Sequence, residues 1–503
     1  MIRHKDSQQL RITEFETPFE TTLDSSNRWV LLANTLPWDE LCSVYNEKMS
    51  QKMGARAIDA RVVIGALIVK HRMKLSDIDT IEYIRENMYV QYFLGLHVYT
   101  YKPVFDPSLF VHIRKRLGLK EFEDMTTFLM KEEENSKAKE DNDEDDFSKK
   151  DEAGNITHKG SIKIDATVTD AEIKYPTDLD LLNSAREKSE ELIDKLCSIS
   201  SFPKPRMYRR NARRDYLSLI KKKVKGKKLL RKGLRKQLAY LFRNIGYIHS
   251  ILDSDPCLIT RLSKAELKYF WVIQLLYDQQ KQMYDERKSS CSDRIVSIHQ
   301  PHVRPIVRGK SKGKVEFGAK IGVCVDNGYS RIDHLSWDAY NESEDLSVHL
   351  ENYKAQHGFY PYRVLGDKIY LNRQNRTLMK ELGIEAVGAP LGRPSKESKR
   401  PEYKAKMRKA AGERNEVEGS FGVAKRRYDM NDIRARLANT AESWIAVGFF
   451  VLNLQRFLRG ILCVLKVIGR NRLIERIKLA IEKTITTMNK ICHPQQARQR
   501  YCG

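Results

Sequence analysis

The hydrophobic pattern of the chain changes at Gly160, from apolar residues at helical spacing to alternation. Before it, residues 59–73 carry apolar side chains three and four positions apart, which predicts an amphipathic helix, and Ser76 is predicted to cap a second helix that continues to Phe93. After it, Ser161–Val168 alternates and contains β-branched residues, which predicts a strand. A second strand is predicted at Val315–Val325, ahead of a hairpin turn at Asp326-Asn327-Gly328. Helices and strands in a chain of 503 residues predict an α/β protein of two to four domains.

Changes of pattern and composition divide the chain into six segments. Successive short helices before residue 130, the last of them basic and ending near Gly118, fit a helix-turn-helix DNA binder and a generic helical packing domain equally well. An acidic run follows, and such a run cannot bury enough apolar surface to order itself. The predicted segments are a helical N-terminal domain at 1–130, a charged linker at 131–159, the first part of an α/β core at 160–177, a basic helical insertion at 178–290, the rest of the core with C-terminal helices at 291–480, and a basic tail at 481–503.

The charge balance is strongly basic. Lys and Arg total 90 against 66 Asp and Glu, for a formal net charge of +24. Such an excess predicts attraction to a polyanion, with nucleic acid first and an anionic membrane surface second, although a basic surface without a partner stays open. The densest basic run, within 204–243, includes Arg209, Arg210, Arg213 and Arg214. We expect a helical hairpin whose cationic face contacts DNA phosphates, with a solvated charged face as the alternative.

Cysteine spacing and hydropathy exclude several classes of protein. The eight cysteines form no Cys-x-x-Cys pair, so neither a zinc site nor a disulfide framework is predicted, and reduced thiols fit the cytoplasm. The polar start predicts no signal peptide. The most apolar stretch, 444–454, is shorter than the ~20 residues that a membrane span requires, so a buried helix is expected. His299 and His302 could be metal ligands, but a structural or surface role is favoured because no cysteine lies nearby.

Three acids occupy positions where rigid neighbours would hold them. Asp165 lies inside the predicted strand, Asp367 ends a short predicted strand, and Glu418 lies on a helix predicted at 401–428. Carboxylates on rigid elements suit a two-metal phosphoryl-transfer site, because Mg²⁺ prefers oxygen ligands. A triad chosen from 66 acids has little specificity by itself, and a surface position is the default for each member.

Two cations flank the third acid. Arg414 and Lys425 stand four residues before and seven residues after Glu418, which places all three on one helix face. This pattern fits a plain ion-pair ladder. It also fits a site in which Glu418 holds a metal ion while the two cations contact the DNA backbone.

The motif Arg414-x3-Glu418-x6-Lys425 resembles the signature around the catalytic glutamate of DDE transposases encoded by bacterial insertion sequences. In that signature a tyrosine stands three residues before the arginine, where this chain has Ala411. Further stretches are similar to the same family, in the same order: Tyr92–Leu96 with Asn87, Asp165–Val168, Arg308–Lys310, Glu316–Lys320, Trp337–Glu342, Gly366–Tyr370, Asn375–Arg376, Leu391–Pro394 and Glu418–Gly422.

This resemblance implies a fold and a set of site residues. The fold is a ribonuclease H-like catalytic core, a mixed sheet flanked by helices, with an all-α N-terminal DNA-binding domain and a helical insertion between the first two acids. The implied cofactor is a pair of Mg²⁺ ions, for which Mn²⁺ would substitute. The implied catalytic residues and metal ligands are Asp165, Asp367 and Glu418, and the implied DNA contacts are Arg414, Lys425, Arg308 and Lys310.

The activity implied by the resemblance is transposition. The protein would bind the inverted-repeat ends of its insertion sequence, cleave a strand there, and join the freed 3′-hydroxyl to target DNA. We expect a homodimer on double-stranded DNA in the bacterial cytoplasm, with no membrane partner. Two alternatives stay open: a DNA-binding regulator or inactive derivative without catalysis, and a metal nuclease of repair or RNA cleavage. The presence of all three acids with their flanking motifs favours the active transposase.

Overall fold

The computed structural model of the chain describes most of its residues and forms two compact units. The described residues are 11–17, 22–50, 57–137, 148–150, 152, 154–224, 226–307, 315–392 and 400–461. The helical unit comprises residues 1–110, 120–146 and 450–503, and the sheet unit comprises residues 111–119 and 147–449. Arg308, Lys310 and the predicted tail at 481–503 lie outside the described residues.

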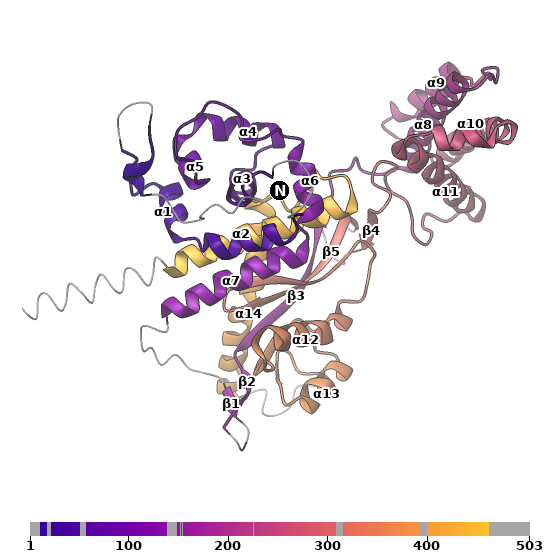
Figure 1. Ribbon diagram of the computed structural model, residues 1–503. Helices are drawn as coiled ribbons and strands as arrows, with labels where there is room; N and C mark the ends of the chain where they lie inside the picture. Colours follow the sequence, from indigo (N-terminus) through magenta and orange to yellow (C-terminus); the bar gives the residue numbers. More distant parts are fainter. Residues whose placement is uncertain are drawn as a thin grey trace, which may run out of the picture. The chain divides into compact units, whose positions relative to one another are not determined.

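Short helices make up the N-terminal region, as predicted (Figure 1). They are η1 (Ile12–Glu14), α1 (Arg28–Thr35), α2 (Trp38–Glu47), α3 (Ala60–Met73), α4 (Asp77–Glu86), α5 (Met88–Phe93), α6 (Leu109–Arg116) and α7 (Leu119–Lys137). The predicted cap Ser76 starts α4 by accepting a hydrogen bond from the Asp79 amide at 3.0 Å. The helix predicted to continue to Phe93 instead breaks at Asn87, whose side chain caps α5 through the Val90 amide at 3.1 Å.

Part of the predicted linker is ordered, so the expectation that 131–159 would not fold is wrong for these residues. Helix α7 runs through the acidic stretch to Lys137. Glu133 is buried there because it pairs with Arg456 at 3.2 Å. Strands β1 (Ser148–Lys150) and β2 (Ile156–Lys159) form an antiparallel hairpin.

A helix at 438–461 contains the apolar stretch that was predicted to be buried. Its second half belongs to the helical unit rather than to a core extending to residue 480. The reason is packing against α7: Phe450 lies 5.7 Å from Phe122 between ring centroids, and Asn453 donates a hydrogen bond to Thr126. In the described part of the chain, no helix is both long enough and apolar enough to cross a membrane.

A six-stranded mixed sheet forms the centre of the sheet unit, which confirms the α/β prediction. Its strands are β3 (Ser161–Asp170), β4 (Arg304–Val307), β5 (Val315–Asp326), β6 (Tyr329–Ser336), β7 (Arg363–Gly366) and β8 (Glu385–Val387). The order is β4-β5-β3-β7-β8, and β6 also pairs with β5. The β3–β7 and β7–β8 pairs are parallel, and the other pairs are antiparallel. Asn327 and Gly328 join β5 to β6 with φ of 49° and 83°, as a tight hairpin requires.

Helices cover both faces of the central strands (Figure 1). The remaining elements here are η3 (Glu342–Glu344), α12 (Asp345–His357), α13 (Arg373–Glu381) and α14 (Pro401–Arg427). Ile162 and Ile164 of β3 pack with Leu350 of α12. The intervening Lys163 pairs instead with Glu416 of α14 at 2.8 Å. Since side chains alternate along a strand, Asp165 shares the α14 side of β3 with Lys163.

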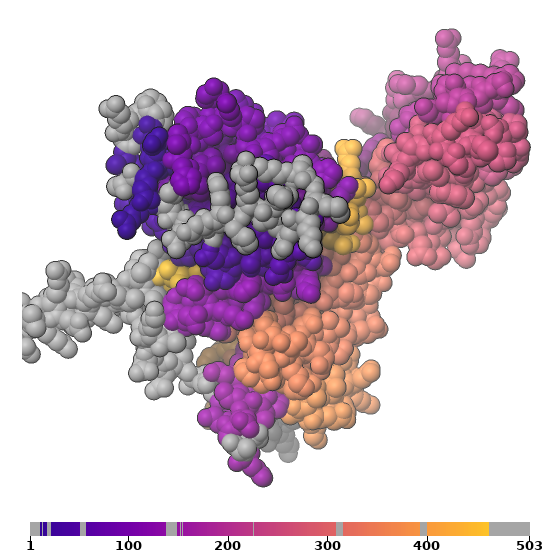
Figure 2. Space-filling model, viewed as in Figure 1, coloured from indigo at the N-terminus to yellow at the C-terminus, as the bar shows by residue number. Residues whose placement is uncertain are grey.

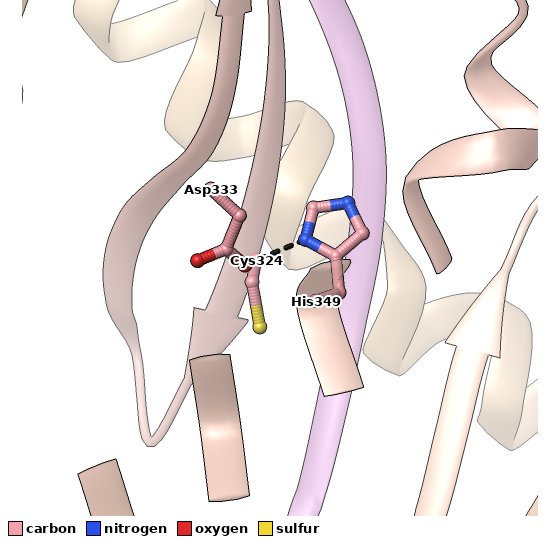
Figure 3. A group of neighbouring side chains, drawn as sticks. All are labelled: Cys324, Asp333 and His349. Carbon is pink, nitrogen blue, oxygen red and sulfur yellow. Dashed lines mark hydrogen bonds and ion pairs between the residues drawn. The ribbon is translucent and has the colours of Figure 1, made fainter. Parts of the chain in front are cut away.

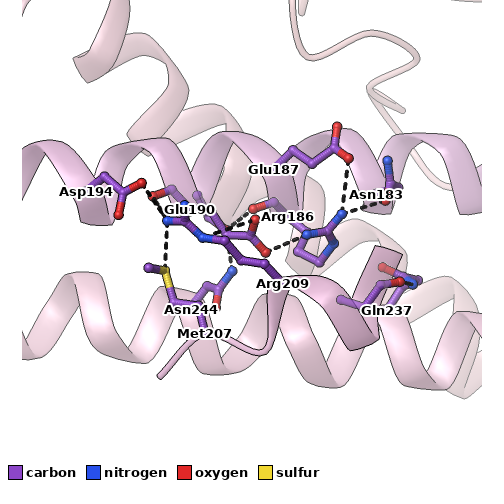
Figure 4. Close-up of polar contacts among 11 residues, drawn as sticks. Asn183, Arg186, Glu187, Glu190, Asp194, Met207, Arg209, Gln237 and Asn244 are labelled. Carbon is purple, nitrogen blue, oxygen red and sulfur yellow. Dashed lines mark hydrogen bonds and ion pairs between the residues drawn. The ribbon is translucent and has the colours of Figure 1, made fainter. Parts of the chain in front are cut away.

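The segment 178–290 is helical as predicted, and its described residues hold four α-helices (Figure 1), whose surface is magenta to pink in Figure 2. They are α8 (Asp178–Ile199), α9 (Arg209–Ile220), α10 (Lys227–Ser254) and α11 (Lys264–Glu286), with the short η2 (Pro256–Arg261) before the last. The hairpin expected within 204–243 corresponds to the second and third of these helices. The insertion has its own apolar core, which includes Leu182, Ile193, Leu241, Ile273 and Leu276. A buried polar network joins its helices, in which Arg186 pairs with Glu190 and Asn244 donates to Ser189 at 2.9 Å (Figure 4).

Candidate active site

Strand register places the first two acids side by side. Strands β3 and β7 are parallel, and Ile164 and Gly366 are their last paired residues. The next residue of the chain is an acid in both cases, Asp165 within β3 and Asp367 directly after β7. Each carboxylate accepts a hydrogen bond from the amide that follows it, Ala166 at 2.8 Å and Lys368 at 2.7 Å. Two acids that are 202 positions apart in sequence (367 − 165) therefore meet at one edge of the sheet.

Helix α14 brings the third acid to the same edge. It is fixed along the strands by two ion pairs, Lys163 with Glu416 at 2.8 Å and Arg363 with Glu413 at 2.9 Å. Arg414 lies between these two anchors. Its guanidinium is 3.2 Å from the Glu418 carboxylate and 3.8 Å from that of Asp367.

The three acids differ in exposure and in electrostatic environment. The Asp367 and Glu418 side chains are 52% and 53% exposed, whereas Asp165 is largely buried. Burial raises the pKa of Asp165 to about 6, although the Ala166 amide opposes that rise. The charges of Glu342 and Asp367 raise this pKa further, and Arg414 lowers it. Asp165 is thus a poorly solvated acid among other acids, an arrangement that a cation would stabilise.

The predicted DNA contacts lie on two helices, α14 and α9. On α14, Arg414 lies between the acids, and Lys425 lies in the last turn beside Arg426 and Arg427. Arg210, Arg213 and Arg214 are exposed on α9. Arg209 differs from them, because its guanidinium pairs with Asp194 at 2.6 Å and donates to the Glu190 carbonyl at 3.0 Å (Figure 4).

Glu342 was not predicted as a site residue. It is the first residue of η3, the next element after β6, its carboxylate is 3.0 Å from the Lys320 ammonium, and its charge raises the pKa of Asp165. The resembling stretch Trp337–Glu342 is the only signal in the sequence that could have pointed to it.

A second cluster has the residue types of a metal site but the surroundings of a structural network. Potential ligand atoms of Cys324, Asp333 and His349 lie within 4.8 Å of one another (Figure 3). Asp333, however, already accepts hydrogen bonds from His349 at 2.6 Å and from Arg331 at 2.5 Å. Burial raises the pKa of the Cys324 thiol well above its usual range, so the thiol stays protonated. A cation here would have to displace the Arg331 guanidinium, so we interpret the cluster as part of the scaffold.

The histidines weighed as metal ligands have other roles. His299 bonds to the Tyr269 hydroxyl at 2.8 Å. His302 packs edge-on against Trp337 at 4.4 Å between centroids, and burial lowers its pKa to about 4. Trp337 donates a hydrogen bond to Glu442 at 3.0 Å, so this tryptophan is engaged within the sheet unit.

Two family models and one curated protein match parts of the chain. The family model described as "Transposase DDE domain" matches residues 364–455, which include Asp367 and Glu418. The model described as "Transposase domain (DUF772)" matches residues 18–116. A curated protein of Rhizobium meliloti, described as "Uncharacterized protein ORF8 in nfe locus", is 26% identical over 111 residues, which cover 22% of this chain and 53% of that protein. The chain thus spans about half the length of that relative. No solved structure matches the chain.

Proposed function

Because its two transposase domains support an insertion-sequence DDE transposase, we propose that this chain binds the inverted-repeat ends of its element and catalyses metal-dependent DNA strand cleavage and strand transfer. The observation that carries the proposal is the meeting of Asp165, Asp367 and Glu418 around Arg414. Asp165 comes from a strand, Asp367 directly follows the adjacent strand, and Glu418 comes from an anchored helix, so rigid elements position all three.

The residues present fit divalent cations. Three carboxylates supply hard oxygen donors, and two of them are open to solvent and hence to a DNA phosphate. Bound ions, proposed to be two Mg²⁺ with Mn²⁺ as a substitute, would neutralise phosphate charge and acidify a water molecule. A bound cation would lower the pKa of Asp165 and so stabilise its buried charge. Arg414 would release its contacts with the acids and pair with the DNA backbone.

Basic side chains suggest a path for the DNA. The exposed Arg210, Arg213 and Arg214 on α9 and the partly buried Lys425 on α14 would contact backbone phosphates, as Arg308 and Lys310 would from outside the described residues. The mixed sheet flanked by helices supports a ribonuclease H-like core. We propose a homodimer in the cytoplasm, because two element ends must be brought together for transfer.

The test compares the wild type with Glu418→Gln in cleaving DNA that carries the element's end, in Mg²⁺ and in Mn²⁺. Glu402→Gln is the matched control, because Glu402 is an exposed acid on the same helix. We expect Glu418→Gln to lose at least ~10²-fold in cleavage rate while it still binds the DNA, and the control to cleave normally.

Two other outcomes would reject parts of the proposal. Equal cleavage by the wild type and Glu418→Gln would remove Glu418 from the chemistry. Tight binding without cleavage by the wild type, in both metals, would favour a DNA-binding regulator over an enzyme.

A further inference from the structure

Helix α6, a short helix of the N-terminal region, presents a basic side to solvent (Figure 1). Its exposed side chains are Val111, His112, Lys115 and Arg116. Offsets of one, four and five positions from Val111 place all of them on one side of the helix. Within the described part of the chain, no acid pairs with Lys115 or Arg116. The two cations are therefore available to an anionic partner.

The opposite side of α6 is packed into the protein interior. Phe110 and Ile113 are fully buried, and the Phe110 ring lies 5.2 Å from the Phe105 ring between centroids. Just before the helix, the Asp106 carboxylate accepts a hydrogen bond from the Ser108 amide at 2.9 Å. Because the buried side is packed and the start of the helix is tied, the exposed side chains project from a rigid backbone, as recognition of a DNA sequence requires.

The other α-helices of the N-terminal region offer no comparable surface among the residues that the structure describes. Helices α3 and α5 have no exposed side chain, α1 exposes a single charge at Arg28, and α7 exposes charges of both signs. Helices α2 and α4 each expose three acids and no base: Asp39, Glu40 and Glu47 on α2, and Asp79, Glu82 and Glu86 on α4. On α4 the half-buried Arg85 is already paired, with Glu82 at 2.6 Å. Since DNA phosphates repel acids, α6 is the helix of this region that suits a duplex.

The exposed side of α6 matches the groups that base pairs display in the major groove. That groove admits an α-helix, and each guanine presents two acceptors there, to which Arg and Lys donate. Arg116 and Lys115 supply such donors, and the His112 ring can donate or accept a hydrogen bond. Val111 offers an apolar contact to a thymine methyl group. Phosphate contacts would need only the cations, so the mixed composition favours contact with base edges.

We propose that α6 lies in the major groove of the element's ends and recognises their base pairs, with Arg116 and Lys115 donating to guanine. The inference rests on the proposed function, because it takes the inverted-repeat ends as the bound DNA. It names the surface through which the N-terminal region meets that DNA, where the sequence left a DNA binder and a packing domain equally open. The alternatives are a solvated basic face and a phosphate contact that is blind to sequence.

The test is fluorescence anisotropy of the full chain with two duplexes of equal length, one carrying the element's end and one of scrambled sequence. Arg116→Ala is compared with Lys131→Ala, the matched control, which removes an exposed cation of α7. We expect Arg116→Ala to lose about 10–100-fold in affinity for the element's end and little for the scrambled duplex. Lys131→Ala should bind both duplexes as the wild type does. Because both side chains are exposed, both variants should unfold at the wild-type temperature.

The two duplexes separate this inference from the proposed function. If the wild type prefers the element's end and Arg116→Ala keeps that preference, the role of α6 in recognising sequence is overturned while the proposed function stands. An equal loss of affinity for both duplexes in Arg116→Ala would likewise overturn it, because α6 would then contact only phosphates. A wild-type chain that binds both duplexes alike would overturn both the recognition of the ends and the role of α6 in it.

Discussion

Asp165 and Asp333 are buried acids on strands of one sheet, and they differ in what surrounds the carboxylate. Asp333 accepts hydrogen bonds from Arg331, His349 and Asn352. Burial by itself would raise the pKa of Asp333, but the His349 hydrogen bond and the Arg331 charge outweigh it and lower the pKa. For Asp165 burial prevails, and the pKa rises to about 6. A buried acid with all its partners supports the scaffold, whereas a buried acid that lacks them, beside other acids, is suited to a cation.

The largest effect on stability is expected from Asp333→Asn. This change removes the charge that balances Arg331, whose guanidinium is itself largely buried, and it leaves a buried cation without its counter-ion. We expect a loss of about 3–5 kcal/mol in the free energy of unfolding, measured by chemical denaturation. Asp338→Asn is the control, because Asp338 is 71% exposed and pairs with Arg304 at 3.5 Å. A loss no greater than that of the control would contradict the structural role of Asp333.

Asp165→Asn is expected to raise the free energy of unfolding, whereas Asp333→Asn lowers it. The pKa of Asp165 is about 6 in the folded chain against 3.8 for the unperturbed group, so the folded state holds the proton more tightly. In metal-free buffer, stability should therefore fall as pH rises from about 4 to about 6. Asp165→Asn should remove this dependence and gain about 1–3 kcal/mol at pH 7, as thermal unfolding across pH would measure. Destabilisation by Asp165→Asn at neutral pH would show that its carboxylate is already satisfied by the protein.

The smallest expected effect is on the salt dependence of DNA binding, and it should differ between Arg209 and Arg213 of the insertion. Arg213 is exposed, so Arg213→Ala should reduce the slope of log affinity for DNA against log salt by about 1, with little change in stability. Arg209 pairs with Asp194 and Glu190, so Arg209→Ala should lower stability and leave the slope nearly unchanged. Fluorescence anisotropy at several salt concentrations measures the slope. Identical slopes for Arg213→Ala and the wild type would exclude α9 from the DNA interface at that position.

Sequence patterns predicted the elements that carry the acids. Alternation predicted β3 and its first residue, although the strand runs two residues past Val168. The Asp-Asn-Gly turn predicted the β5–β6 hairpin, and the cap Ser76 predicted the start of α4. Each is a local signal, because a period or a turn residue acts within a few positions. The sequence did not predict that the acidic segment around Glu133 would be ordered, because Glu133 pairs with Arg456, which lies far from it in the sequence.

Long-range pairs in the site were also beyond local patterns. The meeting of Asp165 with Asp367 depends on the β3–β7 register, and the Lys320–Glu342 pair depends on the path of β6. The resemblance named the three acids without needing this geometry. It did not distinguish Glu342 from Asp338 within one similar stretch, because only the fold shows that Glu342 pairs with Lys320 and Asp338 with Arg304.

The most direct test of the comparison is Mg²⁺-dependent cleavage of element-end DNA by the wild type, Asp165→Asn and Cys324→Ala, measured together. Cys324 belongs to the buried group with Asp333 and His349, and its alanine variant disturbs no charge. We predict that Cys324→Ala cleaves at the wild-type rate and that Asp165→Asn is folded and inactive. Cleavage by Asp165→Asn, or its loss in a folded Cys324→Ala, would contradict the assignment of the metal-dependent chemistry to the carboxylate cluster.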